Sequence, residues 1–147
     1  MSTSPTPMNQ SPNQSPIPPL DERGLPVGYP FKPDWEVTPR QIKDLLARPE
    51  SDPLRPLLVD CRRADEWALC RIVGAVHIPM DQIMSRMDEL QEGPLGRDTP
   101  IVVQCRSGQR SMTVTANLRG VGFTNVKSMA GGILAWSMGI DPSIVRY

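Results

Sequence analysis

Hydrophobic positions divide the chain into short apolar runs separated by polar segments with a different spacing. The runs at 57–59, 75–78 and 101–103 are too short for helices, and a further apolar position stands at Val126. Such runs are typical of strands in a parallel sheet that is covered on both faces. A short first strand is predicted at 35–37.

The first predicted helix has both a start signal and one apolar face. Thr38 can cap it, Pro39 suits the first helical position, and Gln41 completes a capping box. Its apolar face consists of residues three and four positions apart, namely Ile42, Leu45 and Leu46. Pro49 requires the helix to have ended, so it is predicted to run from Pro39 to about Arg48.

Further helices are predicted at 64–69, 80–90, 111–120 and 132–138. The segment 80–90 carries five apolar residues at helical spacing, namely Met80, Ile83, Met84, Met87 and Leu90. We interpret this stripe as core rather than as a methionine-rich binding face. The last helix follows Gly131 and Gly132, which are expected to allow a close helix start.

Strands that alternate with helices predict a parallel α/β sheet with right-handed crossovers. The carboxyl ends of all strands in such a sheet share one edge, where these folds bind ligands. Asp60 and Cys105 each follow a predicted strand. They could therefore face the same crevice.

The two ends of the chain differ in composition from its centre. Residues 1–33 contain nine of the 17 prolines and few aliphatic residues, so they cannot bury enough apolar surface to offset their ordering entropy. We interpret them as a disordered leader rather than a docking motif, with 24–33 able to follow the domain surface through Val27, Tyr29 and Phe31. Residues 34–147 form the expected folded domain, and its tail from Gly139 to Tyr147 is expected to pack loosely.

Charge and hydropathy exclude some classes of partner. Sixteen basic residues balance 16 acidic ones, so nothing global favours nucleic acid or an acidic membrane surface. No window approaches the ~18–20 consecutive apolar residues of a membrane span, and the N-terminus lacks the features of a secretory signal. These features predict a protein that is neither membrane-bound nor exported.

Cysteine and histidine usage limits the available chemistry. Cys61, Cys70 and Cys105 are odd in number and form no C-x-x-C pair, so a reduced, cytoplasmic setting fits best. His77 is the only histidine, which leaves little material for a metal site or a Cys/His catalytic pair. We therefore expect no metal and no organic cofactor, and we expect His77 to be a packed polar side chain rather than a base.

The segment 105–110 joins the strand at 101–103 to the helix that begins near Ser111. A strand, a tight loop and a helix start place Cys105 where backbone N–H groups converge. Thiols titrate near ~8.5, and the pKa falls to roughly 3.5–7.5 beside a helix N-terminus or cations such as Arg106 and Arg110. Gly108 can take a positive φ and turn its N–H inward. These features predict a nucleophilic thiolate in a shallow cradle of N–H groups.

The string CRSGQRS after IVVQ resembles the active-site loop of rhodanese-like sulfurtransferases. The resemblance covers about residues 35–141 and includes LVDCR at 58–62 with Glu66-Trp67, GAVHIP at 74–79, and MAGGI at 129–133 with Ala135-Trp136. It implies an α/β fold with a five-stranded parallel sheet flanked by helices on both faces. It also implies that a cysteine persulfide carries sulfane sulfur from thiosulfate or a similar small-molecule donor to a thiol, cyanide or protein acceptor.

The resemblance also assigns roles by position. Cys105 is the expected catalytic residue. Donor binding is expected from the rest of the loop, namely Arg106, Ser107, Gly108, Gln109, Arg110 and Ser111. Structural support is expected from Asp60, Arg62 and Glu66. Arg106 can attract a divalent anion, whereas Arg110 could either clamp the donor or pair with an acid such as Glu66 or Asp60.

Loop length bears on the class of reaction. Four residues separate Cys105 from Arg110, whereas protein tyrosine phosphatases and phosphatases that share the rhodanese fold have five. The smaller ring favours sulfur transfer over a phosphatase or arsenate reductase. The other alternative is a non-catalytic docking or sensing module that uses the proline-rich leader as its contact segment, and an intact Cys105 argues against it.

Two cysteines carry further alternatives. Cys70-Arg71 stands where the family commonly has Gly-His, which can reshape the turn and adds a cation. Cys61 is either a small buried hydrophobe or a thiol that resolves a persulfide on Cys105.

Overall fold

The computed structural model describes residues 16–147 as a fully parallel five-stranded sheet in the order β1-β5-β4-β2-β3. The strands are β1 (Glu36–Val37), β2 (Leu57–Asp60), β3 (Val76–His77), β4 (Ile101–Gln104) and β5 (Val126–Met129). The α-helices are α1 (Pro39–Leu46), α2 (Ala64–Leu69), α3 (Met87–Leu90), α4 (Gln109–Gly120) and α5 (Gly132–Gly139). The predicted α/β fold class is confirmed.

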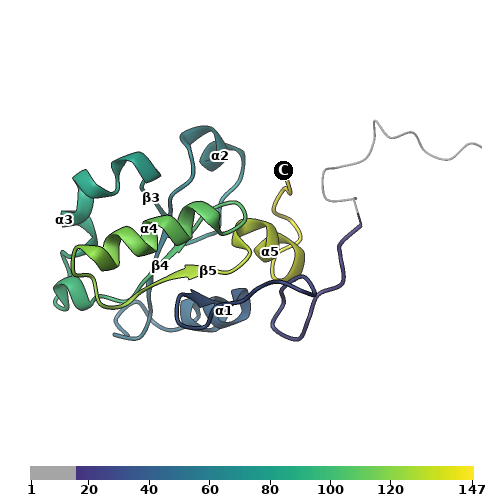
Figure 1. Cartoon of the computed structure of the whole chain (residues 1–147), viewed down its shortest axis with the longest axis horizontal. Coiled ribbons are helices and arrows are strands. Elements are labelled where there is room, and N and C mark those ends of the chain that lie inside the picture. The colour runs from purple at the N-terminus through teal and green to yellow at the C-terminus, as the bar shows by residue number, and fades with distance from the viewer. Residues whose placement is uncertain (1–15) are drawn as a thin grey trace, which may run out of the picture.

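Two hydrophobic clusters cover the two faces of the sheet. One packs α3 and α4 against residues such as Val59 and Val103. The other packs α1 and α5 against Leu58 and Val102. Neighbouring residues of one strand enter different clusters because side chains alternate across a sheet. Figure 1 shows α4 and α1 on opposite sides of β4 and β5.

The pairing of β2 with β4 places two cysteines side by side. Asp60 is in register with Gln104, and the backbone N–H of Cys61 donates to the Gln104 carbonyl at 3.0 Å. Cys61 and Cys105 follow these paired positions, and both lie in the cluster beneath α4. Asp60, one residue earlier, points to the other face by the alternation of the strand. The crevice that Asp60 and Cys105 were predicted to share is therefore not formed.

The segment 80–90 does not form the continuous helix that its spacing predicts. It consists of 3-10 turns at Met80–Gln82 and Met84–Arg86 followed by α3. A 3-10 turn takes three residues rather than 3.6, so the breaks rotate some of the apolar positions outward. Ile83 remains 2% exposed, whereas Met80 and Met84 are 36% and 43% exposed. The interpretation of the whole stripe as core is wrong for these two methionines.

The second half of the proline-rich leader packs against the domain. Leu25 is fully buried in a small cluster with Ala130 and Ala135. The Tyr29 hydroxyl donates to Glu36 Oε2 at 2.6 Å and accepts from the Gly131 N–H at 3.1 Å. Burial, with the hydrogen bond to Glu36, raises the pKa of Tyr29 to about 12. The prediction that 24–33 follows the domain surface is confirmed for Tyr29 and Phe31, which pack against this cluster, and is wrong for Val27, which is 67% exposed. The first 15 residues of the predicted disordered leader lie outside the described residues.

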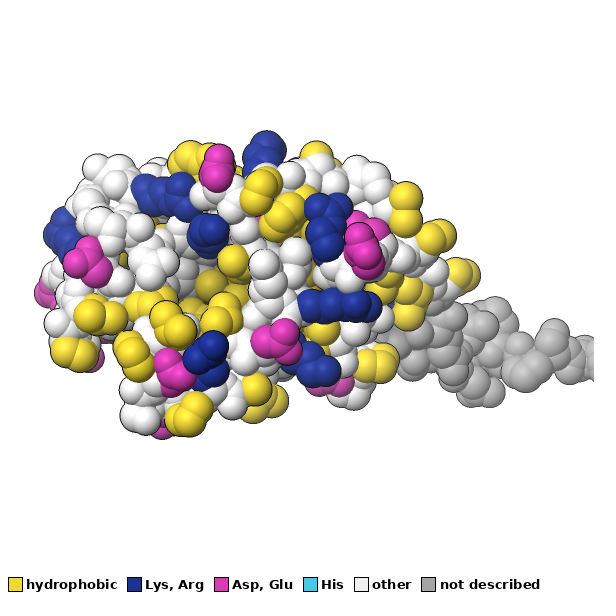
Figure 2. Space-filling model, turned by 90° about the horizontal axis from the view of Figure 1, so that it is seen from below, with side chains coloured by type: hydrophobic (Ala, Val, Ile, Leu, Met, Phe, Trp, Pro, Cys, Tyr) yellow, Lys and Arg dark blue, Asp and Glu magenta, His cyan; other side chains and the backbone are white. Residues whose placement is uncertain are grey.

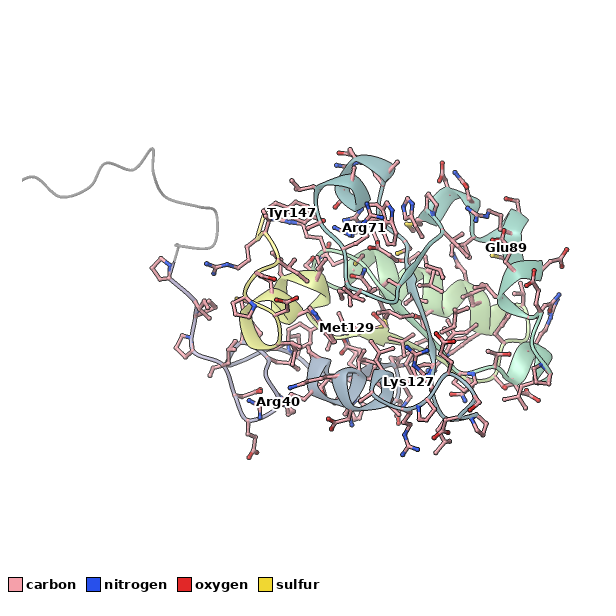
Figure 3. All side chains as sticks on the ribbon, turned by 180° about the vertical axis from the view of Figure 1, so that it is seen from behind. Arg40, Arg71, Glu89, Lys127, Met129 and Tyr147 are labelled. Carbon is pink, nitrogen blue, oxygen red and sulfur yellow. The ribbon has the colours of Figure 1, made fainter. Side chains whose placement is uncertain are left out.

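The C-terminal tail also packs more closely than its composition predicts. Ile144 is 8% exposed, and its carbonyl accepts a 2.6 Å hydrogen bond from Ser137 Oγ in α5. Tyr147 turns back toward α2, where its hydroxyl donates to Glu66 Oε2 at 2.6 Å. Figure 3 labels Tyr147 at the end of the tail that follows α5.

Basic and acidic side chains are interspersed on the face shown in Figure 2, as the balanced composition leads us to expect. Within residues 16–147, none of the helices combines the length and the apolar character that crossing a membrane requires.

The packing of the leader yields a test. We expect Leu25→Ala to lower the free energy of unfolding by about 2–5 kcal/mol, the range for truncating a buried leucine. Val27 lies two residues away and is 67% exposed, so we expect Val27→Ala to change stability by less than about 0.5 kcal/mol. Urea unfolding measures both values, and equal effects of the two substitutions would contradict the packing described above.

Candidate active site

The loop after β4 surrounds the sulfur of Cys105 with hydrogen-bond donors. The backbone N–H groups of Gly108 and Ser111 donate to Cys105 Sγ at 3.1 and 3.4 Å. Gly108 has a φ of 109°, which confirms the predicted positive φ and inward N–H. It is the residue before α4, so the helix N-terminus also faces the sulfur.

A second helix holds the same loop from outside. At the start of α5, the N–H groups of Ile133 and Leu134 donate to the carbonyls of Cys105 and Arg106 at 2.8 and 3.1 Å. Gly132 makes this approach possible because a Cβ atom there would lie 2.4 Å from the Cys105 carbonyl oxygen. The predicted close helix start is confirmed, and what it approaches is the loop itself.

Two buried serines complete the surroundings of the sulfur. Ser111 Oγ lies 3.4 Å from Cys105 Sγ and 2.7 Å from Ser128 Oγ of β5, and both serines are fully buried. Ser128 is not among the residues that the sequence predicts for the site. A polar residue within the short buried run at 126–129 is the signal that could have indicated it.

Charge and hydrogen bonding favour the thiolate form of Cys105. The pKa of Cys105 is lowered to about 5, and the hydrogen bond with the Cys61 thiol has the largest effect. Hydrogen bonds from the Ser111 hydroxyl and from the N–H groups of Ser111 and Gly108 lower the pKa further, whereas burial opposes them. The same hydrogen bond, with burial, raises the pKa of Cys61. The pair therefore consists of one thiol and one thiolate near neutral pH.

Cys105 lies deeper than the shallow cradle that the sequence predicts, since it is only 1% exposed. A hollow of about 730 Å³ opens beside it, and Cys61 and Arg110 are among its lining residues whereas Cys105 is not. The rest of this lining comes from Arg62, Arg63, Ala64, Pro79, Met80, Asp81 and Gln82. Cys61 thus borders the hollow, whereas its neighbour Cys105 does not.

Arg110 pairs with Glu66 rather than with Asp60. Its two Nη atoms donate to the two Glu66 carboxylate oxygens at 2.7 and 2.9 Å. This ion pair is the main reason that the pKa of Glu66 falls to about 2. Tyr147 donates to the same carboxylate, and burial, followed by this hydrogen bond, raises the pKa of Tyr147 to about 12. The arrangement ties α2, α4 and the tail together.

Asp60 and Arg62 form a fully buried ion pair. Arg62 Nη2 donates to Asp60 Oδ2 at 2.7 Å, and both side chains are 0% exposed. The remaining Arg62 donors reach the Cys70 carbonyl at 2.6 Å and the Tyr147 hydroxyl at 2.9 Å. Buried charge is tolerated here because each polar group of the guanidinium has a partner.

The remaining loop side chains point away from the sulfur. Arg106 Nε donates to the Tyr147 carbonyl at 2.6 Å, and the guanidinium lies 5.1 Å from the ring centroid of Tyr147. Ser107 and Gln109 are exposed and line a second hollow of about 500 Å³, together with Tyr29. Of the six donor-binding residues predicted, Gly108 and Ser111 contact the sulfur directly.

Trp67 packs against both His77 and Arg71. The ring of His77 stacks on it at 4.9 Å between centroids, and His77 Nε2 lies 2.7 Å from the Arg62 carbonyl, which confirms the predicted packed polar side chain. The guanidinium of Arg71 lies 4.4 Å from the centre of the same indole ring. Arg71, the cation that replaces the histidine common in the family, is thus stacked on the ring of Trp67. In the part of the chain that the structure describes, no group of three or more His, Cys, Asp and Glu side chains is arranged to hold a metal ion.

The fold and the loop define a class of protein: an α/β domain with a cysteine thiolate held by backbone N–H groups where a helix begins. The family model described as "Rhodanese-like domain" matches residues 38–138. The chain therefore belongs to the rhodanese-like domain family, as its motifs predicted.

Among curated proteins, the chain is similar to the probable adenylyltransferase/sulfurtransferase MoeZ of Mycobacterium tuberculosis, at 35% identity over 114 residues. It is also similar to the adenylyltransferase and sulfurtransferase UBA4 of Meyerozyma guilliermondii, at 33% identity over 94 residues. The matched regions cover 76% and 62% of this chain but only 26% and 22% of those relatives.

Among solved structures, the chain is similar to the human single-domain sulfurtransferase TSTD1, with 25% identity and a TM-score of 0.57 over 69% of this chain and 93% of that one. A thiosulfate sulfurtransferase from Pseudomonas aeruginosa matches with 26% identity and a TM-score of 0.60, over 70% of this chain and 18% of that one.

The contact between α5 and the loop yields a test. We expect Gly132→Ala to cost about 2–5 kcal/mol, since overpacking costs about 1–3 kcal/mol and a left-handed non-glycine residue about 1–2 kcal/mol. Gly93 has open space around it, so Gly93→Ala serves as the matched control and should leave stability nearly unchanged. Thermal unfolding compares the two, and a Gly132→Ala protein as stable as the control would show that the loop does not depend on this close approach.

The lowered pKa of Cys105 yields a second test. The ultraviolet absorbance of the thiolate should appear as pH rises through about 5, because the group loses its proton above its pKa. A Cys105→Ser protein should lack this step. A single step near ~8.5, the value for a free thiol, would contradict the stabilisation of the thiolate by its surroundings.

Proposed function

We propose that this chain is a sulfurtransferase that carries sulfane sulfur as a persulfide on Cys105. The thiolate attacks the outer sulfur of thiosulfate or a similar donor, sulfite leaves with the bonding electron pair, and an acceptor then takes the sulfur from the persulfide. Both the thiolate and the persulfide are anionic. The N–H groups of Gly108 and Ser111 can stabilise either of them, so the cycle requires no separate proton carrier.

The observation that carries this proposal is the pair of backbone N–H groups on Cys105 Sγ, at 3.1 and 3.4 Å. These N–H groups already face the sulfur in the absence of a donor, so the site is preorganised to stabilise an anionic sulfur. The four-residue spacing between Cys105 and Arg110 further favours sulfur over the larger phosphoryl group.

The hollow beside Cys61 and Arg110 is the route that we propose for the donor. Arg110 retains 30% exposure despite its pairing with Glu66, so it can present positive charge to an anion in the hollow. Because Cys105 is 1% exposed, the donor reaches it only when a side chain of the lining moves. Arg106 is exposed and bound to the Tyr147 carbonyl, so its charge can attract the anion toward the loop but does not bind it beside Cys105.

The proposed acceptor is a thiol, which can belong to a small molecule or to another protein. The names of MoeZ and UBA4 support sulfur transfer, and the name of the Pseudomonas thiosulfate sulfurtransferase supports thiosulfate as the donor. Cyanide would serve as a small acceptor in an assay.

The proposal is tested by sulfur transfer from thiosulfate to cyanide. We expect Cys105→Ser to lower turnover by at least about 1,000-fold, because serine cannot form a persulfide and the raised pKa of the neighbouring Cys61 keeps it protonated. Cys70→Ser removes a thiol outside the loop and should retain turnover within about twofold. Hydrolysis of an aryl phosphate that disappears in Cys105→Ser would instead support a phosphatase, and the absence of both activities in the folded protein would support a docking module.

A further inference from the structure

Cys61 and Cys105 are placed by the sheet at a distance that a disulfide can span. They follow the paired residues Asp60 and Gln104, and parallel strands lie about 4.8 Å apart. Their Cα atoms are therefore about 5 Å apart, within the range of about 4.4–6.8 Å for disulfides. Both side chains point to the same face of the sheet, into the cluster beneath α4.

The two cysteines are equally buried, at 1% exposure each, but they differ in their position at the hollow and in protonation. Cys61 lines the hollow of about 730 Å³, whereas Cys105 is not among its lining residues. Hydrogen bonding between the two thiol groups keeps the proton on Cys61 and the negative charge on Cys105. A protonated thiol thus stands next to the sulfur that receives the persulfide, on the side from which a small anion can leave.

Cys70 does not share this arrangement. Its Sγ donates to the Val145 carbonyl at 3.6 Å, and it packs against the cluster on the opposite face of the sheet. Cys70 therefore provides a control for any effect of thiol number alone.

We propose that Cys61 resolves the Cys105 persulfide by forming a Cys61–Cys105 disulfide and releasing hydrosulfide. This inference rests on the proposed function, because it begins from a loaded Cys105. The sulfur of Cys61 bonds to Cys105 Sγ, the bond between Sγ and the outer sulfur breaks, and the outer sulfur leaves with its electron pair. The proton of Cys61 goes to the leaving sulfur, so one thiol and one persulfide anion give one disulfide and one hydrosulfide ion. The persulfide is the oxidant, and no other is required.

The step defines the class of reaction that must follow. The disulfide blocks Cys105 until a reductant with thiol groups, such as a dithiol, exchanges with it and restores both cysteines. Without an external acceptor, the protein thus releases the sulfur as hydrosulfide and receives electrons from a dithiol. An external acceptor that attacks the outer sulfur first receives it by direct transfer and leaves Cys61 reduced.

The test uses the full chain, reduced beforehand and treated with thiosulfate in the absence of oxygen. The wild type should release hydrosulfide and lose about 2 Da in its intact mass as the disulfide forms. Cys61→Ser keeps a hydrogen-bond donor but not the sulfur, so it should gain about 32 Da as a stable persulfide and release at least about tenfold less hydrosulfide. Cys70→Ser should behave as the wild type does, and a small dithiol should restore the original mass of both.

The outcomes separate the two proposals. A wild type that retains the added sulfur as stably as Cys61→Ser overturns the role of Cys61 and leaves the proposed function intact. A Cys61→Ser protein that gains no sulfur, together with a wild type that releases no hydrosulfide, overturns both. Cys61→Ala provides a second variant in case serine disturbs the buried site.

Discussion

The start of α5 determines what the loop around Cys105 can do. Two N–H groups of α5 bind the carbonyls of Cys105 and Arg106, so the carbonyls of this turn face outward. The N–H groups of Gly108 and Ser111 are then left to face the sulfur. A short loop has few backbone conformations in which every N–H and carbonyl group has a partner. The contacts with α5 select the conformation that directs N–H groups toward the sulfur and carbonyl groups away from it. The low pKa of Cys105 depends in part on this division of the backbone groups.

A network of alternating charges surrounds the loop on the α2 side. Asp60 pairs with Arg62, Glu66 pairs with Arg110, and the Tyr147 hydroxyl joins the two pairs. Each ion pair would be costly to bury alone, and the network offsets that cost by satisfying the guanidinium and carboxylate groups together. Residues that are 87 positions apart in the chain, Asp60 and Tyr147, are thereby part of one structure.

Much of the fold could be predicted from the sequence because its signals are local. The capping box at Thr38 and the apolar run at 101–103 each act within a few residues, and the structure contains both elements. The extended motif around Cys105 likewise predicted the positive φ of Gly108 and its N–H on the Cys105 sulfur. The spacing of Met80 and Met84 was misleading, because a stripe at helical spacing does not show whether the chain turns with 3.6 or three residues per turn.

The features that could not be predicted are contacts between distant segments. Nothing near Tyr147 in the sequence indicates Glu66, and nothing near Ser128 indicates Cys105. The depth of Cys105 depends on how several segments close over it, which no local pattern records. Cys61 and Cys105 form a pair only through the register of β2 and β4, and register is a property of the assembled sheet.

Because residues 20–31 pack against the domain, the folded region begins earlier in the chain than the region that matches the family. The family match begins at residue 38, yet the Tyr29 hydroxyl accepts a hydrogen bond from the N–H of Gly131, which precedes α5, and Leu25 packs against Ala130 and Ala135. A fragment that begins at residue 38 would retain every motif of the family but would lose the contacts of Leu25 and Tyr29 with the start of α5. Fragments of this protein that are made for biochemical work should therefore begin before Leu20.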